Sequence, residues 1–202
     1  MSSKAYSKEE REAIRIKLLE VALDMYSQNG IKQTRLIDIL EIVGISKPFF
    51  YKFYPSVEEF IICAITYQWK HIDELINEVE SHTDWSWQEK AYSLFNNFID
   101  YKNNKILIMT QEEEVWVRKR LDDEKYQEFM TIQISFFDKL LTLWEIPKNK
   151  CDPQVLANLV LSMLVIYNSG KKALPFFYTE YLRETAHAQA QCIITYLESL
   201  KV

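Results

Sequence analysis

The sequence predicts an all-α protein of about nine helices. Only 3 glycines and 5 prolines occur among 202 residues, too few turn formers for a protein built of many short strands. Apolar residues instead recur every three or four positions over long stretches, and several stretches open with a helix-capping sequence. Hydrophobic residues make up 48% of the chain, so the helices have ample material for a core.

The first predicted helix begins at Ser7, which forms a capping-box pattern with Glu10. Apolar residues then follow one helical face as far as Tyr26. Gly30 is expected to end this helix, since glycine adopts the backbone conformations found at helix C-termini at little cost. The helix is expected to pack behind the two short helices that follow.

A shorter helix is predicted over Leu36–Val43, with Thr34 as its N-cap. Gly44 supplies the left-handed conformation that a sharp helix end requires. Ser46 is then expected to cap another short helix, whose first turn tolerates Pro48 because first-turn N–H groups have no partner within the helix. Two short helices joined by a glycine-containing turn form a helix-turn-helix, whose second helix enters the major groove of DNA.

The second of these helices carries side chains suited to DNA. Lys47 and Lys52 can neutralise phosphates, and the Tyr51 hydroxyl can donate to a phosphate oxygen. Phe49 offers an apolar face to a thymine methyl group. The predicted DNA-binding residues are Thr34, Arg35, Ser46, Lys47, Pro48, Phe49, Tyr51 and Lys52.

A long helix is predicted from the capping box of Ser56 and Glu59 to about Val79. It is apolar on two sides, so it can face the N-terminal helices at one end and a second core at the other. Further helices are predicted from Ser86 to Asn103-Asn104, over Lys105–Arg120, over Leu121–Ile146, from Asp152-Pro153 to about Ser169, and over Thr179–Leu200.

The stretch from Val155 to Ile166 is apolar nearly all round a helix, so it requires cover on two sides. A second copy of the chain is expected to supply one of these covers. In the last helix, Ala186 and Ala190 lie four residues apart and let a neighbour approach closely. Two such helices from each of two copies would form a four-helix bundle.

The helix-turn-helix region resembles the signature of the TetR family of bacterial transcriptional regulators. The resemblance covers about the first third of the chain, and its residues match in order without a gap. Pro48, Phe49 and Val57 depart from the usual pattern, where glycine, a small residue and lysine are common. The residues that carry the resemblance are Thr34, Ile39, Gly44, Ile45, Ser46, Lys47, Phe50, Tyr51, Tyr54, Ser56, Glu58, Glu59 and Phe60.

The resemblance implies a homodimeric repressor that binds a pseudo-palindromic operator and is released by a small molecule. It implies a DNA-binding domain over residues 1–55 and a helical effector-binding and dimerisation domain over residues 56–202. The effector pocket is expected among the C-terminal helices, and its aromatic candidates favour an apolar or aromatic ligand. The ligand-binding candidates are Trp69, Tyr92, Phe95, Met109, Trp116, Phe129, Phe137 and Tyr167. The dimer-interface candidates are Leu156, Val160, Met163, Leu164, Ala186, Ala190, Ile193 and Leu197.

The distribution of charge indicates which part of the chain can meet DNA. The net charge is −5, but residues 1–57 hold nine basic and seven acidic side chains, whereas residues 58–202 hold 15 and 22. This asymmetry is expected when only the N-terminal part meets phosphate. The run Glu112–Glu114 is expected to be a solvated helix face, with a cationic ligand as the alternative.

No metal site, cofactor or enzymatic activity is expected, because the three histidines lack ligand spacing and no catalytic motif occurs. Three widely spaced cysteines and the charged, non-apolar start of the chain favour a cytoplasmic protein with free thiols. No membrane-spanning segment is predicted. Two rivals stay open: a DNA-binding protein of the same fold controlled by a protein partner or by no ligand, and an all-α enzyme.

Overall fold

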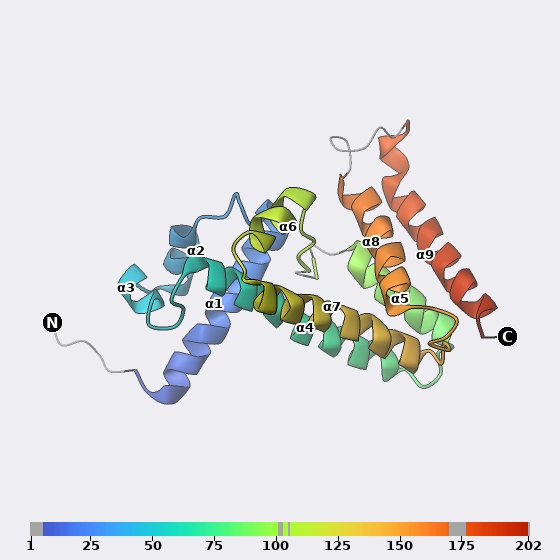
Figure 1. Ribbon diagram of the computed structural model, residues 1–202, viewed down its shortest axis with the longest axis horizontal. Helices are drawn as coiled ribbons and strands as arrows, with labels where there is room; N and C mark the ends of the chain where they lie inside the picture. Colours follow the sequence, from blue (N-terminus) through green and yellow to red (C-terminus); the bar gives the residue numbers. More distant parts are fainter. Residues whose placement is uncertain (1–5, 101–102, 105, 170–176, 202) are drawn as a thin grey trace. The chain divides into compact units, whose positions relative to one another are not determined.

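The structure, a computed structural model, describes residues 6–100, 103–104, 106–169 and 177–201. Over these residues the chain forms nine α-helices and one short 3-10 turn, and no strand (Figure 1). The predicted all-α fold class is therefore confirmed. The helices are α1 Lys8–Asn29, α2 Leu36–Val43, α3 Lys47–Phe50, α4 Val57–Glu80, α5 Trp87–Ile99, α6 Gln111–Arg118, α7 Asp123–Leu143, α8 Pro153–Ser169 and α9 Leu182–Ser199, the last preceded by the 3-10 turn Thr179–Tyr181.

The chain divides into two compact units. The N-terminal unit comprises residues 1–72 and 105–122, and the C-terminal unit comprises residues 73–104 and 123–202. Helix α4 contributes to both units, as expected for a long helix that is apolar on two sides. The functional division predicted between residues 55 and 56 stays a prediction, because packing alone does not say which residues bind DNA.

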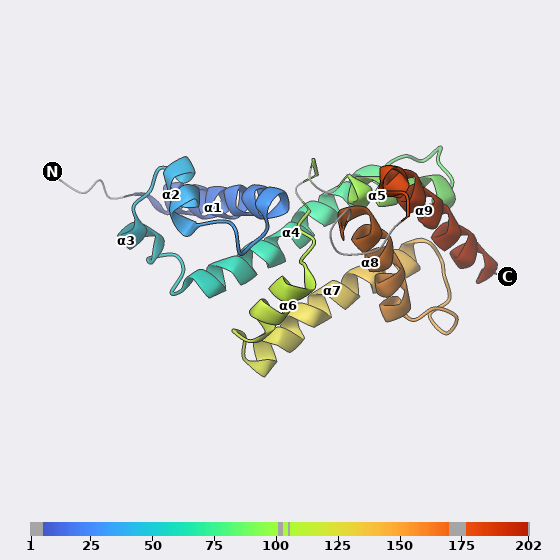
Figure 2. The same ribbon diagram turned by 90° about the horizontal axis from the view of Figure 1, so that it is seen from above.

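The N-terminal unit packs α1, α2 and α3 against the first part of α4. Helix α1 contacts α2, and α2 contacts α3. In both views α3 lies at an outer end of this unit, and α6, which belongs to the same unit, lies away from α3 (Figures 1 and 2). The core is formed by side chains that are nearly or completely inaccessible to solvent: Leu18, Leu19, Ala22, Ile39, Leu40, Phe50, Phe60, Ala64 and Ile65.

The C-terminal unit is built around α5, α8 and α9, which contact one another, with α7 packed on α8. Trp144, which follows α7, is the largest fully buried side chain of the described chain. Its indole meets the Phe95 ring edge-to-face with the ring centres 5.8 Å apart. Aromatic and aliphatic side chains therefore fill the centre of this unit.

The capping boxes predicted at Ser7 and Ser86 are both present. Ser56 accepts a hydrogen bond from the Glu59 N–H at 3.1 Å, so it caps α4 as expected. These local patterns place the starts of α1, α4 and α5 within a residue or two of their predicted positions.

Several predicted helices are shorter than expected, including α5, which ends at Ile99 rather than at Asn103-Asn104, and α9, whose predicted first residues form a 3-10 turn. Helix α6 begins at Gln111, because Thr110 and Glu113 form a capping box there and the Leu107 N–H is held by Gln68 Oε1 at 3.0 Å. The predicted start at Lys105 lies outside the described residues. Helix α7 ends at Leu143, four residues before Pro147, because Glu145 adopts a positive φ of 56°. The Ile146 N–H then bonds back to Leu141 O at 2.8 Å, which completes a Schellman-type helix end.

Candidate nucleic-acid interface

The connection between α2 and α3 is a tight turn of three residues. Gly44 has φ 81° and ψ 35°, the predicted left-handed conformation, and its N–H bonds to Leu40 O at 2.9 Å. The Ile45 N–H bonds to the same carbonyl at 3.1 Å. Ser46 occupies the N-cap position of α3 as predicted, although its hydroxyl makes no capping hydrogen bond. Its carbonyl accepts from the Phe49 and Phe50 N–H groups at 3.0 Å, which starts the helix.

Phe50 attaches α3 to the core of the N-terminal unit. Its side chain is fully buried. Its ring meets that of Phe60 edge-to-face with the ring centres 5.2 Å apart, and its ring centre lies 5.6 Å from that of Tyr54. The same surroundings raise the pKa of Tyr54 to about 12, because burial disfavours the phenolate. With Phe50 directed inward, the opposite side of this turn faces solvent.

The outward side carries most of the predicted DNA-binding residues. Lys47, Pro48, Tyr51 and Lys52 are all exposed, so their side chains can reach a phosphate or a base edge. Phe49 is only half-exposed, because its ring packs against two others: its ring centre lies 4.9 Å from that of Tyr6 and 5.1 Å from that of Phe53. These contacts hold the Phe49 ring in place beside the exposed cations.

Thr34 does not cap α2, so this part of the prediction is wrong. The N-cap residue is Arg35, and the Thr34 hydroxyl donates instead to Gly30 O at 2.8 Å. This bond ties the end of α1 to the start of α2. Because Thr34 is half-buried while Arg35 is exposed, Arg35 is the better placed of the two to contact DNA.

Arg35 forms a two-point hydrogen bond with Asp38 on the same helix. Its Nε and Nη2 atoms donate to the two carboxylate oxygens at 3.0 and 2.6 Å. This bond lowers the pKa of Asp38 and raises that of Arg35. Contact between Arg35 and a phosphate would exchange one anionic partner for another.

The predicted ligand-binding residues are divided between the two units. Trp69, Met109 and Trp116 belong to the N-terminal unit, and only Trp116 lines a described pocket. In the C-terminal unit Phe95 and Phe129 are buried core residues, with 0% and 3% of their surface exposed. Tyr92, Phe137 and Tyr167 are half-buried in the same unit. The effector pocket predicted among the C-terminal helices stays a prediction.

The eight predicted dimer-interface residues lie on the inner faces of α8 and α9. Each has less than a tenth of its surface exposed in the single chain, because α8 and α9 pack on each other and on α5. Their side chains therefore form the core rather than a surface for a second copy, and the choice of face needs correction. The residues concerned are Leu156, Val160, Met163, Leu164, Ala186, Ala190, Ile193 and Leu197.

The exposed face of α8 and one exposed stripe of α9 carry no charged side chain. Helix α8 contains no Asp, Glu, Lys or Arg, and the outer stripe of α9 between Thr185 and Ser199 consists of small or polar side chains. The exposed residues of α8 are Gln154, Val155, Asn158, Leu161 and Ser162, and the uncharged stripe of α9 is formed by Thr185, Ala188, Cys192, Thr195 and Ser199. Beside this stripe, Arg183, Glu184, Gln191, Tyr196 and Glu198 of α9 are also exposed.

Glu113 does not lie on the solvated helix face that was predicted for Glu112–Glu114. Glu113 is 5% exposed and accepts the Ile31 N–H at 2.6 Å. Its other oxygen accepts from Thr110 N and Oγ1 at 2.9 and 3.0 Å. One carboxylate thus joins the start of α6 to the loop after α1. The capping-box pattern of Thr110 and Glu113 was the signal that distinguished it from its neighbours.

Comparisons with known proteins identify the fold of the chain. No protein-family profile and no curated protein sequence matches it. Among solved structures, it is similar to a TetR-family transcriptional regulator from Cytophaga hutchinsonii, with a TM-score of 0.63 and 16% identity over 94% of this chain and 98% of that one. It is also similar to NemR from E. coli in its reduced form, with a TM-score of 0.57 and 12% identity over 93% and 96% of the two chains.

A third similar structure is PfmR, a TetR-family transcriptional regulator from Thermus thermophilus, with a TM-score of 0.50 and 18% identity over 94% and 97% of the two chains. The matches extend over nearly the whole length of each chain, so the likeness includes the C-terminal helices as well as the helix-turn-helix. The chain therefore has a TetR-like fold.

Two features typical of other classes of protein are absent from the described residues. No helix among them is long and apolar enough to cross a membrane. Within the same part of the chain, no group of three or more His, Cys, Asp or Glu side chains is placed to hold a metal ion.

Proposed function

We propose that this protein is a dimeric, DNA-binding transcriptional repressor of the cytoplasm, released from its operator by a small molecule. The observation that carries the proposal is the α2–turn–α3 unit, in which buried Phe50 fixes α3, while Lys47 on this helix and Tyr51 and Lys52 directly after it are exposed. Exposed lysines and a tyrosine hydroxyl at this helix and the turn after it suit contact with phosphates along the major groove. The TetR-like fold supports a regulator rather than an enzyme.

The outer faces of α8 and α9 are the proposed dimer interface. Surfaces that stay in water usually carry many charged side chains, whereas the centres of protein interfaces are depleted of them. A two-fold pair of these faces would form a four-helix bundle in which Ala188 and its small neighbours allow close approach. A dimer of this kind would present two α3 helices to two half-sites about 34 Å apart.

The effector is proposed to be small and largely apolar or aromatic. It would bind among the C-terminal helices, shift α4 and so alter the separation of the two α3 helices. The coupling between effector and operator would then be about 1–3 kcal/mol, the usual range for such systems. A second candidate keeps the same DNA-binding role under the control of a protein partner or of no ligand. It is favoured by Phe95 and Phe129, two predicted pocket residues that are core residues instead.

Tyr51→Ala is expected to weaken operator binding about tenfold, by the loss of one phosphate or base contact of roughly 1–2 kcal/mol. Binding would be measured in a salt series on the DNA upstream of the protein's own gene, and on fragments selected from random DNA. The control is Tyr178→Ala, which removes a tyrosine that is 70% exposed outside the N-terminal unit. Binding that is equally weak on every sequence would refute the proposed operator recognition.

Ala188→Arg is expected to convert the dimer to a monomer of 24.1 kDa. In a two-fold interface the substitution appears twice, so two buried arginines would meet, and like charges brought together cost several kcal/mol. Light scattering after size exclusion measures the mass, with Gln127→Arg on the exposed side of α7 as control. A wild-type protein that is monomeric at micromolar concentration, or an Ala188→Arg protein that stays dimeric, would contradict the proposed interface.

A further inference from the structure

The N-terminal unit contains an open pocket between α6 and the loop after α1. Its volume of about 360 Å³ lies near the lower end of the range of ligand sites. Residues 112, 115, 116 and 119 follow the three- and four-residue spacing of one helical face, which explains how a short helix supplies most of the lining. The lining residues are Lys32, Glu112, Val115, Trp116, Lys119 and Arg120.

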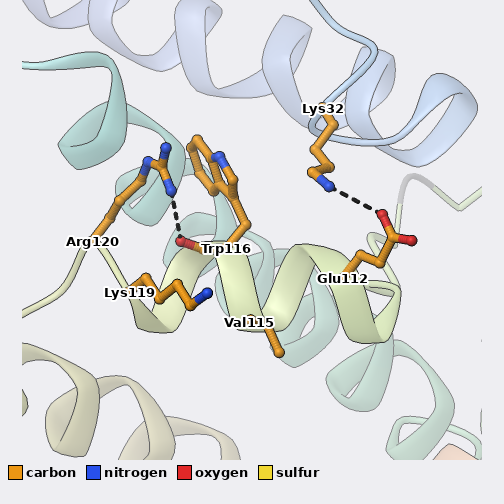
Figure 3. A pocket seen from close by; sticks show the side chains of 6 residues that line it. All are labelled: Lys32, Glu112, Val115, Trp116, Lys119 and Arg120. Atoms are coloured by element: carbon orange, nitrogen blue, oxygen red, sulfur yellow. Dashed lines mark hydrogen bonds and ion pairs between the residues drawn. The ribbon is translucent and has the colours of Figure 1, made fainter.

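Positive charge exceeds negative charge in this pocket, with three cations and one carboxylate in its lining. Lys32 Nζ pairs with Glu112 at 3.0 Å on one side, and the Arg120 guanidinium lies 4.0 Å from the Trp116 ring centre on the other (Figure 3). Arg120 also forms a long ion pair, with its Nε atom 3.7 Å from Glu58 Oε1. Lys119 makes no ion pair with another described residue, so its ammonium is left for an incoming anion.

The same pocket offers apolar surface beside these charges. The Trp116 indole is half-exposed, and Val115 is 47% exposed. A flat aromatic group can lie against an indole or a guanidinium plane while its acid group meets an ammonium. The lining thus combines an apolar wall with unbalanced positive charge.

A buried contact fixes the two walls of the pocket relative to each other. Glu113, next to Glu112, accepts the Ile31 N–H at 2.6 Å, and Ile31 is next to Lys32. Gly30 makes this close approach possible, since a Cβ at that position would lie 2.9 Å from Glu113 Oε1. The pocket is therefore held in shape before any ligand arrives, which reduces the entropy cost of binding.

We propose that this pocket binds a small organic anion with a flat apolar body, of the class of aromatic carboxylates. Lys119 and Lys32 would meet the acid group, and Trp116 with Arg120 would hold the ring. Apart from Trp116, these residues differ from the candidates for the C-terminal effector pocket. The proposal does not depend on DNA binding, and its test uses no DNA.

The test is calorimetric titration of the full-length protein with 1-naphthoate and with its neutral analogue 1-naphthylmethanol. We expect naphthoate to bind at one site per chain, with an affinity that falls as salt rises. We expect the neutral alcohol to bind about tenfold more weakly or not at all, since it lacks the charge-assisted hydrogen bond. Lys119→Glu and Trp116→Leu should each weaken naphthoate binding by about tenfold.

Lys201→Glu is the matched control, because Lys201 Nζ also lies over a tryptophan, 4.1 Å from the Trp87 ring centre, but in the C-terminal unit. It should leave naphthoate binding unchanged. The proposal is overturned if naphthoate does not bind, if the neutral alcohol binds equally well, or if Lys201→Glu weakens binding as much as Lys119→Glu. A circular dichroism spectrum of each variant establishes that a lost affinity is not a lost fold.

Discussion

Replacing Phe50 with alanine is expected to lower the free energy of unfolding of the N-terminal unit by about 3–5 kcal/mol, the usual cost of removing a fully buried phenylalanine. Phe50 has no exposed surface, and its ring meets those of Tyr51, Tyr54 and Phe60. Helix α3 has only four residues and cannot persist on its own. The variant should therefore lose specific DNA binding as well as stability. Urea unfolding followed by circular dichroism measures the change.

Phe49→Ala is the matched control for Phe50→Ala, because it removes the same side chain from the neighbouring position. Phe49 is half-exposed and contacts Tyr6 and Phe53 at the surface, so we expect a loss of only about 1 kcal/mol. Its effect on DNA binding should exceed its effect on stability. Equal destabilisation by the two variants would show that α3 is not held by Phe50 alone.

Glu113→Ala is expected to destabilise the N-terminal unit by about 2–4 kcal/mol. The substitution leaves the N–H of buried Ile31 without its acceptor, and such an unpaired donor costs about 1–3 kcal/mol before the lost Thr110 bonds are counted. Glu113→Gln should cost less, because one amide oxygen can still accept. The amide nitrogen cannot, so one of the two backbone donors stays unpaired.

Glu112→Ala provides the comparison on the same helix. Glu112 pairs with Lys32, but 83% of its side chain is exposed, so water replaces the lost partner. We expect a change of less than about 1 kcal/mol. Thermal or urea unfolding of the three variants would test the assignment, and a Glu112→Ala effect as large as that of Glu113→Ala would contradict it.

The sequence predicted the helices well where a local signal marks their ends. Ser7, Gly44 and Ser86 act within a few residues of themselves, so a pattern of three or four letters is enough to locate them. Thr34 was misplaced because a threonine before a helix has the same local pattern whether it caps the helix or bonds back to Gly30. Only the path of the preceding loop decides between these two roles.

Periodicity identified the apolar faces of α8 and α9 but not what covers them. Residues such as Met163 and Ala190 were assigned to a second copy, yet α5, α8 and α9 of the same chain already bury them. Glu113 was missed for a related reason, since its partner Ile31 lies 82 positions away in the sequence. Contacts between distant segments leave no trace in the spacing of neighbouring residues.

The two described glycines bear on how this protein can change by mutation. Gly30 and Gly44 both have positive φ, and they flank α2 on either side. At Gly44 only the backbone conformation resists a side chain, which asparagine tolerates best, whereas at Gly30 the Glu113 carboxylate also occupies the space. The intervening positions Ile37, Glu41 and Ile42 are exposed and free of such constraints. Substitutions are therefore restricted at Gly30, which ends α1, and at Gly44, which ends α2, but are permitted at the exposed positions of α2. New contacts can arise on this helix without a change in its orientation.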